Sequence, residues 1–233
     1  MQHIRDKKII GHRGAPRLAP ENTLKGFQKA IDVGVDMIEF DVRKSKDGVF
    51  IVHHDPDIDD QLLAELTFSQ AKRLALNQGF NLPTLEAALK LMRGKVQLDI
   101  ELKEEGDEAA VVDLIKSHTH LDDVVVTSFH HKAIERIQAM TSQIKVGCIL
   151  GKRDQFLSWA KKGRMNPGLN VSALHRSLVK PRFLKKFEDK PILVWTVNEP
   201  EQMETFLLHE HIAGVVTDVP DVALQIKQML IKR

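Results

Sequence analysis

Acidic residues interrupt two apolar stretches of the chain that are otherwise typical of buried strands. Glu39 and Asp41 lie in MIEFDV. Glu101 lies in VQLDIEL, a run that ends directly before Lys103. Because side chains alternate along a strand, Glu39 and Asp41 point to the same face, as do Glu101 and Lys103. Three carboxylates brought together repel one another and raise their pKa values unless a cation is present. Oxygen ligands suit Mg²⁺ or Ca²⁺ better than zinc, so this pattern favours one divalent cation of that kind.

Histidines lie close to these acids in the sequence. His12 ends the run IIGH, and His54 follows VFIV, which comes after a Lys-Asp-Gly turn signal. The unperturbed pKa of histidine, about 6.5, lets the ring donate or accept a proton near neutrality. The residue types therefore predict acid–base chemistry beside a cation, provided that the fold brings them together.

Strand and helix patterns alternate along the chain. Strands are predicted at 9–12, 37–42, 50–54, 96–102, 124–129, 145–150, 169–174, 192–197 and 214–218, with helical periodicity in most of the intervals, including 154–162 and 181–189. The few residues before 50 cannot form a parallel crossover, so 50–54 must return antiparallel to 37–42 as a hairpin arm. Eight strands remain, which predicts an α/β fold of the (β/α)8 TIM-barrel type, with a doubly wound open sheet as the alternative.

Polar residues collect at the ends of the predicted barrel strands, where catalytic groups of such barrels lie. These ends carry His12-Arg13-Gly14, Glu39 and Asp41, Glu101 and Lys103, Ser128-Phe129, Trp195 to Asn198, and Thr217-Asp218. With a turn near 46–48, the returning strand places residues 53–55 opposite Asp41. The arm is therefore expected to bring His54 back to the carboxylates.

Bulk properties set outer limits on function. The 233 residues are 42% hydrophobic and 28% charged with a net charge of +2, which predicts one globular domain, residues 1–233, and no nucleic-acid partner. Neither a signal peptide nor an apolar run of about 18 residues is evident, so a cytoplasmic protein without stable membrane association is expected. The single cysteine, Cys148, is expected to be an inert core thiol. The oligomeric state stays open.

Longer motifs connect these observations with a known family. The stretch from HRGAPRLAPENTLKGF to IEFDVRKSKDGVFIVHHD resembles the signature of glycerophosphodiester phosphodiesterases, and LPTLEAAL, DIELK, TSF, VWTVN and GVVTDVP follow in the family's order. The resemblance implies a TIM barrel that hydrolyses diesters such as glycerophosphocholine to sn-glycerol 3-phosphate and an alcohol. In the family's usual scheme the glycerol 2-hydroxyl attacks first and water then opens a cyclic phosphate.

The resemblance also implies roles for individual residues. Glu39, Asp41 and Glu101 correspond to the metal ligands, and His12 and His54 to the acid–base pair. The substrate-binding residues would be Arg13 and Lys103, whose positive charges suit a phosphodiester anion, and Trp195, which could pack on the glycerol carbons. Which histidine acts first stays open, as does the choice between Mg²⁺ and Ca²⁺.

Several other polar residues are expected to be structural. Helix capping and loop hydrogen bonds are favoured for Glu21 and Asn22, and an inner-layer partner role for Asp99. His53 is expected to point away from His54 as a solvated or structural residue. His130 and His131 open a helix outside any motif and are expected to have no direct role.

The insertion after the arm departs from the family. The segment from HHDPDIDD to NLPTL lacks the Arg-Thr-Thr element and is short. This difference leaves the preferred alcohol open, and a lysophospholipase D-type substrate or another bulky diester is the alternative. A barrel that binds phosphate without catalysis is a further alternative, which expects a lost ligand or histidine.

Overall fold

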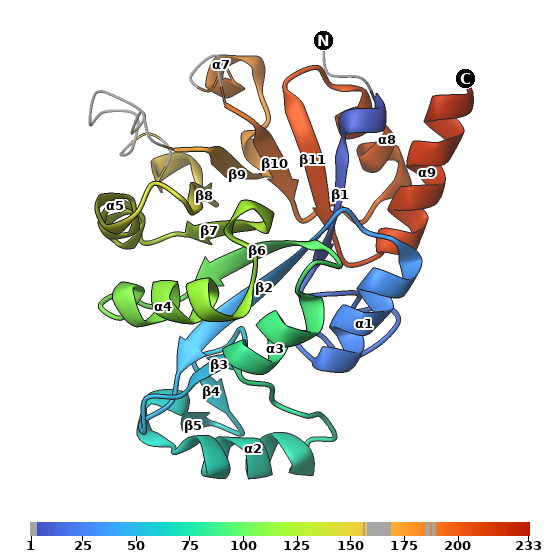
Figure 1. The fold of residues 1–233 in the computed structure, drawn as a ribbon. Helices are drawn as coiled ribbons and strands as arrows, with labels where there is room; N and C mark the ends of the chain where they lie inside the picture. Colours follow the sequence, from blue (N-terminus) through green and yellow to red (C-terminus); the bar gives the residue numbers. More distant parts are fainter. Residues whose placement is uncertain (1–3, 156, 158–168, 185–186, 188–189) are drawn as a thin grey trace.

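Eight parallel strands form a closed barrel in the computed structural model, which describes residues 4–155, 157, 169–184, 187 and 190–233 (Figure 1). Their bounds are β1 Lys8–His12, β2 Met37–Lys44, β6 Gln97–Leu102, β7 Val124–Ser128, β8 Lys145–Leu150, β9 Val171–His175, β10 Ile192–Trp195 and β11 Ile212–Thr217. Neighbours pair in the order β1-β11-β10-β9-β8-β7-β6-β2, and β1 pairs with β2 to close the ring. The predicted barrel is confirmed, and the open-sheet alternative is wrong because both edges pair with each other.

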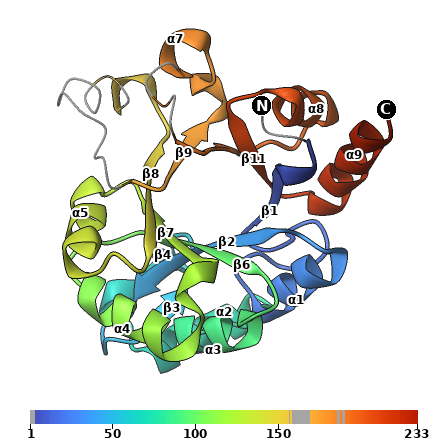
Figure 2. The same cartoon turned by 45° about the horizontal axis from the view of Figure 1, so that its top comes forward.

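Helices surround the strands, as Figure 2 shows. Their bounds are α1 Leu24–Val33, α2 Phe68–Asn77, α3 Leu85–Met92, α4 Glu108–His118, α5 His131–Met140, α7 Pro181–Leu184, α8 Pro200–Leu208 and α9 Pro220–Lys232. The helix predicted at 154–162 lies largely outside the described residues, as does the later part of the one predicted at 181–189. Among the helices that the structure describes, none combines the length and apolar character needed to cross a membrane.

The hairpin arm follows β2 as predicted. Strand β3, Phe50–Val52, pairs antiparallel with β2 through the partners Val42 and Val52. Gly48 takes a φ of 82° in the turn, a backbone conformation open to glycine. The prediction that the strand continues through residues 53 and 54 is wrong, because the chain turns away after β3 into the loop that carries both histidines.

A small insertion follows the arm and appears in teal at the bottom of Figure 1. It contains a two-stranded sheet, β4 Asp57–Ile58 and β5 Gln61–Leu62, followed by α2. The two short strands are absent from the sequence prediction, since two residues carry no detectable alternation. The insertion has its own apolar cluster, which includes Ile51, Ile58, Leu63, Ala71 and Leu82.

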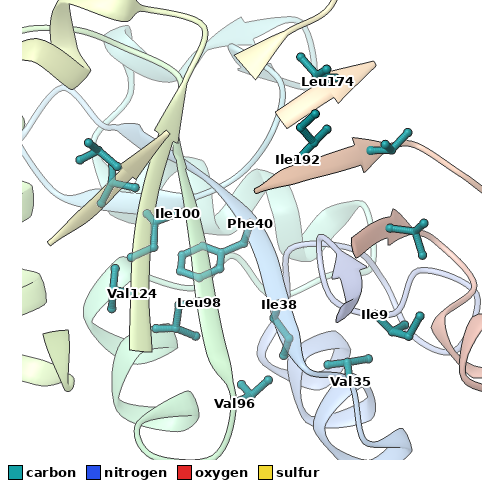
Figure 3. Packing of buried hydrophobic residues seen from close by; sticks show 14 of the residues in the cluster. Ile9, Val35, Ile38, Phe40, Val96, Leu98, Ile100, Val124, Leu174 and Ile192 are labelled. Carbon is teal, nitrogen blue, oxygen red and sulfur yellow. The ribbon is translucent and has the colours of Figure 1, made fainter. Parts of the chain in front are cut away.

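Alternation along β2 and β6 separates an outer apolar layer from an inner polar one. Ile38 and Phe40 of β2 and Leu98 and Ile100 of β6 are fully buried among the helices, and Figure 3 shows them side by side. The intervening positions of both strands face the barrel interior. The acids therefore lie inside the barrel because the apolar residues on either side of them fill the strand–helix layer.

Strand β9 begins at Val171 and ends at His175, whereas the pattern predicts 169–174. Asn170 explains the later start, because its backbone N–H donates to Val146 O at 2.8 Å and its side-chain oxygen accepts from Val146 N at 2.9 Å. At this point the side-chain oxygen of Asn170 takes the place of a backbone carbonyl in the ladder. The regular strand therefore starts one residue later, at Val171.

Candidate active site

The turn after β1 places Arg13 against the acidic cluster. Arg13 has a φ of 52°, an uncommon value for a side-chain-bearing residue, and its N–H donates to Glu39 Oε2 at 3.0 Å. Gly14 follows with a φ of 100°, and a Cβ there would come within 2.9 Å of the Gly26 backbone. The His-Arg-Gly motif therefore makes a tight turn that directs a backbone donor at a buried carboxylate.

Glu39, Asp41 and Glu101 converge at the mouth of the barrel. One carboxylate oxygen from each lies within 4.8 Å of the others, and all three residues are at most 8% exposed. The strand register explains the convergence, because Asp41 pairs with Glu101 across β2 and β6. The structure thus brings the three predicted ligands together.

Burial and mutual repulsion shift the protonation of this cluster. Burial raises the pKa of Glu39 well above its usual range, and the charges of Asp41 and Glu101 add to that rise. Burial and the Asp41 charge also raise the pKa of Glu101. Asp41 differs, because Lys103 and Arg13 outweigh its burial and lower its pKa. A cation among these oxygens would relieve the repulsion, so the donor set fits a hard divalent ion.

Two cationic side chains border the carboxylates. Lys103 Nζ lies 2.7 Å from Glu101 Oε1 and 3.1 Å from Asp41 Oδ1. Arg13 Nε lies 3.3 Å from Asp41 Oδ2, yet this buried N–H makes no hydrogen bond. Asn22 donates to the same Asp41 oxygen at 2.8 Å. Positive charge on both sides of the cluster can hold an anionic group next to it.

His12 is held by a carboxylate from the opposite end of the chain. Its Nδ1 donates to Asp218 Oδ1 at 2.6 Å, while its Nε2 lies 3.9 Å from Glu39 Oε2. Asn198 donates to the other Asp218 oxygen at 2.6 Å and accepts from the Asp218 N–H at 2.9 Å. These bonds fix the His12 ring so that Nε2 faces the site, an arrangement that suits proton transfer.

His54 is held in a similar way from the arm. Its Nδ1 lies 2.7 Å from Asp55 Oδ1, and its carbonyl accepts from Arg43 Nε at 2.8 Å. Burial lowers the pKa of His54, and the positive charge of Lys103 lowers it further. The arm returns as predicted, since His53 N donates to Asp41 O at 3.1 Å and brings the following residue to the barrel mouth.

These groups surround one cavity of about 240 Å³. Its lining includes the charged and imidazole groups His12, Arg13, Glu39, His54, Glu101 and Lys103. The rest of the lining is mostly apolar and includes Trp195 and Phe129, whose rings meet edge to face with centroids 5.7 Å apart. All eight predicted site residues except Asp41 line this cavity, and Asp41 lies just behind Arg13 and Lys103.

Of the residues that were expected to be structural, Asp99 lines the cavity, whereas Glu21, His53 and His130 are not part of its lining. Asp99 accepts from Thr127 Oγ1 at 2.6 Å, and burial raises its pKa to about 7. Glu21 accepts from Arg13 at 2.8 Å. His53 stacks on Phe80 with centroids 6.0 Å apart and is structural rather than solvated. His130 contacts Glu105 and the Lys103 carbonyl in the loop after β6.

Sequence reasoning gave no role to Asp218 or Asn198. The available signal was that β1 and β11 both end in polar residues. Gly11 pairs with Thr217 across these strands, so the next positions, His12 and Asp218, lie side by side. Closure of the barrel makes those positions adjacent, so the strand count combined with this register could have found the pair.

Comparisons with known proteins agree with this geometry. The model of the glycerophosphoryl diester phosphodiesterase family matches residues 12–222. A glycerophosphodiester phosphodiesterase of Bacillus altitudinis is 28% identical over 244 residues, which cover 95% of this chain and 98% of that protein. One from Caldanaerobacter subterraneus subsp. tengcongensis is 26% identical over 238 residues, covering 94% and 96%.

Solved structures share the fold. The glycerophosphodiester phosphodiesterase of Thermotoga maritima superposes with a TM-score of 0.78 at 25% identity, covering 98% of this chain and all (100%) of that one. A phosphodiesterase of Oleispira antarctica, solved with its product sn-glycerol 3-phosphate, has a TM-score of 0.81 at 23% identity and covers 97% and 100%. The match over most of the chain shows that it belongs to the glycerophosphoryl diester phosphodiesterase family, whose members are phosphoric diester hydrolases.

Proposed function

We propose that this protein hydrolyses small glycerophosphodiesters to sn-glycerol 3-phosphate and an alcohol, with one divalent cation held by Glu39, Asp41 and Glu101. The observation that carries the proposal is the convergence of these three buried carboxylates between two histidines and two cationic side chains. A bound cation would supply charge stabilisation for the phosphoryl oxygens.

The protein's own residues supply binding and proton transfer. Arg13 and Lys103 neutralise the charge of the diester and the charge that develops in the transition state. His12 and His54 each keep one ring nitrogen on a carboxylate and present the other to the cavity, so one can accept the proton of the attacking hydroxyl while the other donates to the leaving alkoxide. Trp195 and Phe129 pack on the carbon atoms of the substrate.

Cavity size supports a small leaving alcohol. The volume of about 240 Å³ lies below the roughly 300–1,000 Å³ of pockets that enclose drug-sized ligands. Glycerophosphocholine and glycerophosphoethanolamine are therefore favoured over lysophospholipids. We further propose that residues 1–233 act as one domain in the cytoplasm. A nine-stranded sheet that includes both the first and the last strand supports the single domain, and a lone, buried Cys148 suits the cytoplasm.

The test is hydrolysis of glycerophosphocholine by metal-stripped protein with added Mg²⁺ or Ca²⁺, followed through release of glycerol 3-phosphate. The expected result is release that depends on the ion and is lost in Glu39→Gln, while the exposed-surface control Glu86→Gln keeps it. Release that is the same in the stripped protein would contradict the cation role. Turnover of lysophospholipids alone would contradict the choice of substrate, and no turnover of any diester would leave only the phosphate-binding alternative.

A further inference from the structure

The backbone around Lys103 is fixed by neighbours on both sides. Its N–H donates to Val42 O at 3.2 Å, which ties it to β2. The carbonyl of Leu102 accepts from Ser128 Oγ at 2.6 Å, and that of Lys103 accepts from His130 Nε2 at 3.1 Å. Both carbonyls that flank the Lys103 side chain are therefore held from the end of β7.

The second ring nitrogen of His130 is also occupied. Nδ1 lies 3.1 Å from Glu105 Oε1, so the ring spans two residues of the loop that follows β6. A backbone carbonyl and a carboxylate only accept hydrogen bonds. Both ring nitrogens of His130 therefore face hydrogen-bond acceptors of this loop.

Other contacts fix the ring and extend the same support. The His130 N–H donates to Ser128 Oγ at 2.9 Å, which sets the backbone from which the ring projects. Arg136, further along α5, donates to Glu105 at 2.7 Å and to Glu108 at 2.6 Å. His130 and α5 thus hold the loop after β6 at Lys103, Glu105 and Glu108.

We propose that His130 is a positioning residue that fixes the backbone of Lys103, so that Nζ points toward Asp41 and Glu101 and toward the phosphate of the substrate. It acts through Lys103 and touches neither the proposed cation ligands nor the cavity. Its role in catalysis rests on the proposed function, but its hold on the loop does not. This role differs from the expectation that His130 has none.

The first arm of the test measures kcat and KM of His130→Ala, His130→Gln and a matched control, His211→Ala. His211 is an exposed histidine next to the start of β11, at the far end of the strands from the site. His130→Ala is expected to lower kcat/KM about fivefold, a modest value because the ring is half exposed. His130→Gln should recover most of the loss, since its amide can still donate to the Lys103 carbonyl. Equal kcat/KM for wild type and His130→Ala would overturn the proposal.

The second arm needs no turnover. Amide hydrogen exchange of the same variants is expected to be about fivefold faster in residues 102–107 of His130→Ala, with other segments and the melting temperature close to those of His211→Ala. Faster exchange throughout α5 with an unchanged loop would instead show a merely structural role and overturn the proposal. If the wild type cleaves no glycerophosphodiester, the proposed function fails, and this arm still decides whether His130 holds the loop.

Discussion

The two histidines of the site have the same chemical arrangement but different supports. Each places Nδ1 on an aspartate, at 2.6 Å for His12 and 2.7 Å for His54. The partner of His12 is Asp218, 206 residues later, half-buried and braced by Asn198. The partner of His54 is the next residue, Asp55, whose side chain is 64% exposed.

This difference separates what the barrel provides from what the arm provides. His12 ends β1 and Asp218 directly follows β11, so the pairing of these two strands fixes their distance. His54 stands on a loop, and its position depends on β3 and on the Arg43 contact with its carbonyl. His12 should therefore be held more rigidly than His54. The expected effects of substitutions follow, from the largest to the smallest.

The largest effect should come from removing either imidazole. His12→Ala and His54→Ala are each expected to lower kcat about 10²–10⁴-fold, because each removes one proton-transfer group. Steady-state hydrolysis of glycerophosphocholine measures this, with His118→Ala, a partly exposed histidine near Glu86 that does not line the cavity, as the control. Full activity in either variant would show that the two histidines do not share the chemistry.

Removing the orienting charges should separate the two supports. Asp218→Asn is expected to lower kcat about 100-fold, since a half-buried charge braced by Asn198 fixes the His12 ring, and Asp55→Asn only about tenfold. The ratio of the two kcat values under identical ion and pH conditions is the measurement. Equal losses would mean that burial of the aspartate does not matter.

Smaller effects should follow from the residues that brace each unit. Asn198→Ala frees one Asp218 oxygen, and Arg43→Met frees the His54 carbonyl, so each should lower kcat about threefold to tenfold. If Asn198 acts through Asp218, adding Asn198→Ala to Asp218→Asn should cause little further loss of kcat in a double-mutant cycle. Additive losses would contradict that connection.

The smallest expected effect concerns stability rather than rate. Asp218→Asn should lower the free energy of unfolding by about 1–3 kcal/mol and Asp55→Asn by less than about 1 kcal/mol, as measured by urea unfolding at pH 7. Burial alone would raise the pKa of Asp218, but the hydrogen bond and charge of His12 outweigh it, so the pKa is lowered.

The pH dependence of that difference follows from the lowered pKa. The stabilisation by ionised Asp218 is present above the unfolded pKa of about 3.9 and is lost as the pH falls through the lower folded value. The unfolding free energies of wild type and Asp218→Asn should therefore approach each other below about pH 4. A constant difference down to pH 2 would contradict this assignment.

The barrel and its hairpin arm could be predicted from sequence because the alternation within strands and the length of the intervals between them are both local patterns. Alternating acids and apolar residues in β2 and β6 mark strands with a polar inner face, and the short interval before β3 requires a hairpin. Two-residue strands in the insertion carry no such pattern. The late start of β9 depends on the Asn170 side chain, which replaces a strand residue in the ladder.

Site residues that lie in sequence motifs could be predicted. Residues that become neighbours only when the barrel closes were harder to find. Glu39, Asp41, His12 and His54 lie within one continuous signature. Asp218 becomes a neighbour of His12 only through the pairing of the last strand with the first. His130 was missed for a related reason, since its contact with the Lys103 carbonyl depends on the packing of two loops.

The pairing of β1 with β11 also bears on the order in which the protein becomes active. During synthesis His12 leaves the ribosome long before Asp218, and the barrel can close only once the last strand is available. The His12–Asp218 contact is therefore among the most non-local in the chain and forms with the slow, long-range part of folding. The recovery of hydrolysis after dilution from denaturant should thus report ring closure, and lag behind the recovery of helical signal.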